Sequence, residues 1–68
     1  MAKQIDVVEE MRILSNLGSM PGHTTTVDRA MAKALVFHET VFCGGYLRNI
    51  RAKHLGVGVY KIYTEAAK

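Results

Sequence analysis

The chain has 68 residues, which allows one domain, spanning residues 1–68, with a modest hydrophobic core. A single cysteine excludes an internal disulfide, so we expect a reducing, cytoplasmic compartment and added stability from a homodimer. The longest apolar run is far shorter than the roughly 20 residues that cross a bilayer, and no secretion signal follows the N-terminus. We therefore predict no membrane partner.

The formal net charge of +3 is unevenly distributed. Residues 1–34 contain four basic and four acidic residues, whereas residues 35–68 contain five basic and two acidic residues. No acidic residue occurs from Tyr46 to Tyr63. This asymmetry favours a polyanionic partner, and the alternative is a solvated basic face that aids solubility.

Residues 5–17 predict an amphipathic helix. Asp6 is a suitable N-cap, the helix dipole favours acidic residues in the first turn, and Gly18 is expected to end the helix. The expected buried stripe consists of Val7, Met11 and Leu14, widened by Val8 and Leu17.

Residues 26–37 predict a second helix. Thr25 and Asp28 have the spacing of a capping box, with Thr24 and Thr26 as alternative caps. The apolar stripe of this helix consists of Val27, Met31, Ala34 and Leu35.

The C-terminal half contains stronger strand signals. Residues 40–43 have strand propensity, which Gly44 and Gly45 interrupt, and residues 57–64 are rich in β-branched and aromatic residues. Residues 46–55 suit either a short helix, which we favour, or a strand. The predicted fold is α+β, with two or three short helices and a small C-terminal β-hairpin.

The candidate nucleic-acid contacts lie in this half. They are Arg48, Arg51, Lys53, His54 and Lys61, interleaved with Tyr46, Tyr60 and Tyr63. On a helix, the cations would reach phosphates or base edges in a major groove. On a hairpin, Arg48 and Lys61 would share one strand face and form a basic ribbon that also fits a groove. We expect the tyrosines to be half-buried core residues rather than stacking platforms.

The pattern Leu47-x-x-Ile50-x-x-x-x-Leu55-Gly56, followed by residues 57–63, resembles a winged helix-turn-helix domain. The resemblance covers residues 5–64 and implies binding of double-stranded DNA. It places Arg48, Arg51 and Lys53 on the recognition helix and Lys61 on the β wing. However, residues 38–45 are longer than the usual turn between the second and third helices of that family.

A second mapping onto the same family begins the recognition helix at residues 24–29. It directs Thr25, Thr26, Arg29 and Lys33 toward DNA and makes residues 40–63 a long wing. Because only one helix then precedes the recognition helix, a partner subunit would complete the core.

The cysteine, the histidines and the methionines are expected to have structural roles. Cys43 follows Val41 and Phe42, so it is expected to be a buried apolar residue rather than a nucleophile. The spacing of His23, His38 and His54 matches no compact zinc site, and Met11, Met20 and Met31 suit core or dimer packing. No phosphate loop or catalytic triad pattern is present in the sequence, so we predict no enzyme activity and no cofactor.

The leading functional prediction is a small DNA-binding protein, acting as a transcriptional regulator or accessory factor. The alternative is a protein–protein interaction module, such as a phage-type inhibitor or adaptor. RNA binding through the same cations and an enzyme that uses Cys43 are less favoured.

Overall fold

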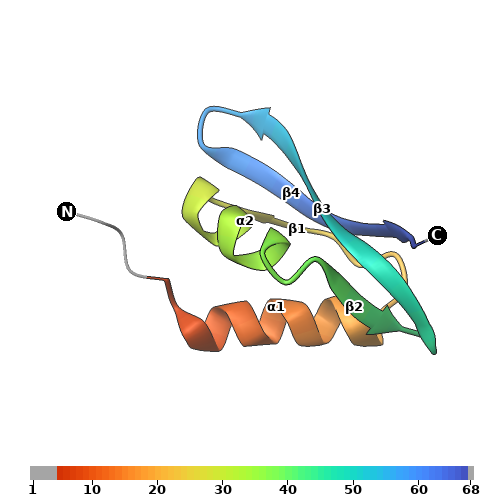
Figure 1. Ribbon diagram of the computed structural model, residues 1–68. Helices are drawn as coiled ribbons and strands as arrows, with labels where there is room; N and C mark the ends of the chain where they lie inside the picture. The colour runs from red at the N-terminus through yellow and green to blue at the C-terminus, as the bar shows by residue number, and fades with distance from the viewer. Residues whose placement is uncertain (1–4, 68) are drawn as a thin grey trace.

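Two helices and one antiparallel sheet make up the fold of the described residues, which confirms the α+β class. The computed structural model describes residues 5–67 (Figure 1). The elements in chain order are α1 (Val7–Ser19), β1 (Thr25–Val27), α2 (Arg29–Val36), β2 (Thr40–Cys43), β3 (Tyr46–Gly56) and β4 (Val59–Ala66). The strands form a four-stranded sheet in the order β1-β4-β3-β2, so the C-terminal hairpin β3–β4 lies at its centre.

Helix α1 begins where the sequence predicts. The Asp6 carboxylate accepts hydrogen bonds from the backbone N–H groups of Val8 (3.0 Å) and Glu9 (3.2 Å), as expected of an N-cap. The predicted stop at Gly18 is wrong, because the helix continues to Ser19. Gly18 instead permits close packing, since a Cβ there would lie 2.8 Å from the Phe42 carbonyl oxygen on β2.

The buried stripe of α1 agrees with the predicted one only in part. The burial predicted for Leu17 is confirmed, whereas Val7 and Met11 remain 64% and 59% exposed and Ile13, which was not predicted, is buried. The apolar residues of this helix cover a wide arc of its surface, so their spacing alone did not identify the side that faces the sheet.

Helix α2 is shorter than predicted, because the first two expected residues, Thr26 and Val27, belong to β1 and Asp28 is the N-cap. Thr25 pairs with Ile62 and Val27 with Tyr60 on β4, as suits a β-branched run. Asp28, rather than a threonine, caps α2 by accepting a hydrogen bond from the Met31 backbone N–H at 2.9 Å. The burial predicted for Met31 and Leu35 is confirmed.

The helix favoured for residues 46–55 is wrong, and the strand alternative is confirmed. Strand β3 pairs with β2 on one side and with β4 on the other. Gly44 and Gly45 have φ values of 62° and 86°, and they connect the paired residues Cys43 and Tyr46 in a two-residue turn. The first winged-helix mapping, which requires a recognition helix here, is therefore also wrong.

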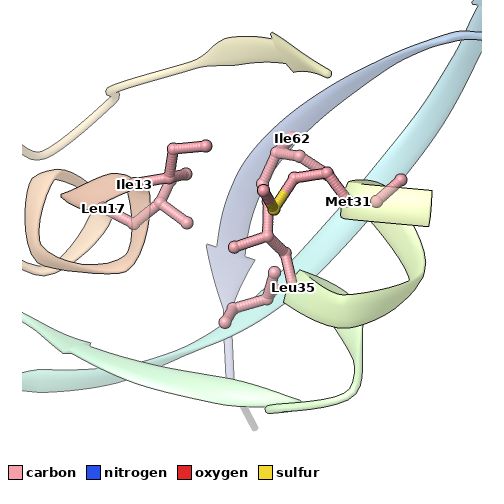
Figure 2. Packing of buried hydrophobic residues seen from close by; sticks show 7 residues of the cluster. Ile13, Leu17, Met31, Leu35 and Ile62 are labelled. Carbon is pink, nitrogen blue, oxygen red and sulfur yellow. The ribbon is translucent and has the colours of Figure 1, made fainter. Parts of the chain in front are cut away.

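The core lies between the two helices and one face of the sheet. Figure 2 shows Ile13 and Leu17 of α1 together with Met31 and Leu35 of α2 and with Ile62 of β4. Cys43 is also buried, at 4% exposure, which confirms its predicted burial. Of the methionines predicted to pack in a core or dimer, only Met31 is buried in the single chain, since Met11 and Met20 are exposed.

Candidate nucleic-acid interface

One face of the sheet carries most of the predicted contact residues. Ile50 and Ile62 are buried beneath the helices, so the residues adjacent to them along β3 and β4 point to the opposite face. No described helix covers that face, which we call the open face. By strand register it consists of Thr26 on β1, Thr40 and Phe42 on β2, Leu47, Asn49, Arg51 and Lys53 on β3, and Lys61, Tyr63 and Glu65 on β4.

Three cations gather on the open face of the hairpin. Lys53 lies directly opposite Lys61 across the β3–β4 ladder, and Arg51 lies opposite Tyr63. Like charges directly opposite each other destabilise a strand pair. The Lys53–Lys61 pair therefore costs folding stability in the isolated chain.

The three cations differ in how far acidic groups neutralise them. The Arg51 Nε donates a hydrogen bond to Glu65 Oε1 at 2.7 Å, in an exposed ion pair. Lys53 and Lys61 make no ion pair with any residue in the described range 5–67. The Lys61 ammonium lies 5.9 Å from the centroid of the Tyr63 ring. Two free ammonium groups thus remain on this face.

Arg48 does not join this cluster, so the prediction that it shares a strand face with Lys61 is wrong. Arg48 has the same strand parity as Ile50 and lies on the helix side of the sheet. Its Nε donates to Thr64 Oγ1 at 3.0 Å and its Nη2 donates to the Thr64 carbonyl oxygen at 3.3 Å. Arg51, and not Arg48, lies on the same face as Lys53 and Lys61.

The residues of the second winged-helix mapping do not form one surface. Thr25 and Thr26 are adjacent on β1, so their side chains point to opposite faces of the sheet. Arg29 and Lys33 are exposed and one turn apart on α2, which packs on the helix side. Thr26 alone of these four residues lies beside the cations of the open face, opposite Lys61.

The aromatic residues are distributed between the two faces. His54 lies on the helix side, where its ring centroid is 4.9 Å from that of Tyr60. Tyr60 and Tyr63 are half-buried, as predicted, but Tyr46 is 77% exposed. Sequence reasoning missed Phe42, which is 69% exposed and pairs with Leu47 at the opposite end of the open face from the lysines.

Two acidic residues of α1 pair with neighbouring basic side chains. A side-chain hydrogen bond from Arg12 holds the pKa of the Glu9 carboxyl below its ordinary value, and the same bond raises the pKa of Arg12. His38 Nε2 lies 2.9 Å from Glu10 Oε2. Within residues 5–67, no group of three or more His, Cys, Asp or Glu side chains is placed to hold a metal ion.

Neither described helix has the length and apolar character that a membrane-crossing segment requires. Comparisons of this chain with protein-family models, with curated proteins and with solved structures found no match.

Proposed function

We propose that this protein binds double-stranded DNA through the open face of the β3–β4 hairpin. The observation that carries the proposal is the group of three cations, Arg51, Lys53 and Lys61, on a surface that no described helix covers. Phosphates would neutralise Lys53 and Lys61, which face each other and have no acidic partner within residues 5–67. The role would be that of a transcriptional regulator or accessory factor.

The main alternative explanation for these cations is protection of a sheet edge. Natural edge strands often carry lysine to prevent pairing with other chains, and β2 covers β3 only as far as Asn49 in the ladder. Edge protection accounts for Arg51 and Lys53. It does not account for Lys61, because there β4 is an interior strand that pairs with β1 through Thr26 and with β3 through Lys53.

The proposal does not depend on the winged-helix resemblance, because α2, the recognition helix of its second mapping, packs on the helix side of the sheet and not on the open face. Contact through the cations of the open face relies on phosphates, which position a protein but do not read sequence directly. We therefore expect affinity for mixed-sequence duplexes, with modest discrimination among them.

The proposal is tested by fluorescence anisotropy with a labelled mixed-sequence duplex at low salt. The double variant Lys53→Gln/Lys61→Gln should weaken binding by about tenfold, because it removes two phosphate contacts. The matched control is Arg12→Gln, a cation already paired with Glu9 on α1, which should leave affinity unchanged. The proposal is wrong if the double variant binds as tightly as wild type, or if Lys33→Gln on α2 has the larger effect.

A protein–protein interaction module is the second candidate, and a specific observation supports it. Phe42 and Leu47 form an exposed apolar pair on the open face, and Val7, Val8 and Met11 are exposed on α1. Aromatic and aliphatic side chains of this kind anchor protein interfaces. Recovery of one stoichiometric protein partner, unaffected by nuclease and lost in Phe42→Ser, would favour this candidate. Homodimer formation remains a prediction, for which the exposed residues of α1 are the natural contact.

A further inference from the structure

A pocket on the helix side of the sheet, between α2 and the hairpin, is separate from the open face. It has a volume of about 440 Å³, within the range of roughly 300–1,000 Å³ that small-molecule sites occupy. The side chains that line it are Arg29, Ala32, Lys33, Val36 and Phe37 from α2 and its C-cap, and Ala52 and Tyr60 from the hairpin.

The walls of this pocket continue the hydrophobic core. Ala52 and Tyr60 have the same strand parity as Ile50 and Ile62, so they point to the helix side of the sheet. Ala52 is nevertheless exposed, because the space between it and α2 is not filled. An apolar group placed there would cover Ala52 and Ala32 and complete the packing beyond the end of the core.

The rim of the pocket is cationic. Arg29 and Lys33 lie one helical turn apart at its edge, and no acidic side chain lines it. Neither cation makes an ion pair within the described residues. An apolar interior beside two free cations is complementary to a molecule that has an apolar body and one anionic head.

We propose that the pocket between α2 and the β3–β4 hairpin binds a small amphipathic carboxylate, whose apolar body packs on Ala32, Val36, Ala52 and Tyr60 while its head group meets Arg29 and Lys33. Apolar burial supplies most of the affinity, and the cations select the sign of the head group. This inference is independent of DNA binding, since none of these residues lies on the open face.

The test is methyl NMR of the full chain, titrated with decanoate below its micelle concentration and, separately, with decyltrimethylammonium. Decanoate should shift the methyl signals of Ala32, Ala52 and Val36 in a saturable manner. The cationic amphiphile should bind at least about fivefold more weakly, because its head group meets two cations with which it cannot pair. Equal binding of the two amphiphiles, or shifts confined to the exposed residues Val7, Val8 and Met11, would overturn the inference.

Two variants distinguish this pocket from unspecific adsorption. Ala52→Leu fills the pocket from an exposed position and should abolish the saturable shifts of Ala32, while an unchanged melting temperature shows that the chain still folds. Arg29→Gln/Lys33→Gln should weaken decanoate binding by about fivefold or more, whereas Arg12→Gln on α1 should not change it. Decanoate affinity that survives in Ala52→Leu would contradict the assignment.

Discussion

Single residues at the helix ends show how far local chemistry determined this structure. Asp6 was identified correctly because aspartate is a preferred N-cap residue and it directly precedes the amphipathic run. Asp28 was assigned to the wrong position, since three threonines precede it and each is an acceptable cap. The sequence does not reveal that residues 25–27 pair with β4 as a strand, so that the helix begins later and Asp28 becomes its N-cap.

Gly18 provides the sharpest prediction at this scale. Alanine has the higher helix propensity, by about 1 kcal/mol, so Gly18→Ala would be stabilising if α1 were isolated. In the folded chain the new Cβ would meet the Phe42 carbonyl oxygen at 2.8 Å. We expect Gly18→Ala to lower the free energy of unfolding by about 1 kcal/mol or more in urea denaturation.

Ser15→Ala is the matched control, because Ser15 is exposed on the same helix. It should be neutral or slightly stabilising. A Gly18→Ala variant as stable as wild type would show that α1 and β2 are not in close contact at this point.

Strands were harder to predict than helix ends because their side chains depend on distant partners. Residues 46–55 contain apolar residues at both helical and alternating spacing, so local pattern left the choice open. The sequence signal that favours the strand is Gly44-Gly45 between two apolar runs, because this pair is typical of a two-residue hairpin turn. Because successive side chains of a strand point to opposite faces, Arg48 and Arg51 lie on opposite faces of β3. Arg51 therefore lies beside the lysines and Arg48 does not.

The Lys53–Lys61 pair gives a prediction at the scale of the hairpin. Lys53→Glu replaces two opposed cations with an opposite-charge pair, so it should raise the free energy of unfolding by about 0.5 kcal/mol. The same change should weaken DNA binding more than Lys53→Gln does, because it introduces repulsion with phosphate. Thermal and urea denaturation would measure the first effect and anisotropy the second. A Lys53→Gln variant no more stable than wild type would mean that the two ammonium groups do not repel each other in the folded chain.

The whole molecule presents two surfaces of different character. The open face has an apolar end at Phe42 and Leu47 and a basic end at Lys53 and Lys61, whereas the helix side contains the core and the pocket beside α2. The charge asymmetry of the sequence drew attention to the C-terminal half, which contains the three cations of the open face. It did not indicate which cations share a surface, because sheet register determines that.

The salt dependence of DNA binding tests the central claim, that the open face of the hairpin contacts phosphates, most directly. Three phosphate contacts give a slope of about −2.7 when the logarithm of the association constant is plotted against the logarithm of salt concentration. We predict a slope of about −2 to −3 for wild type, and a slope shallower by about 1.8 for Lys53→Gln/Lys61→Gln. Identical slopes for the two proteins would show that these lysines do not contact the backbone of DNA.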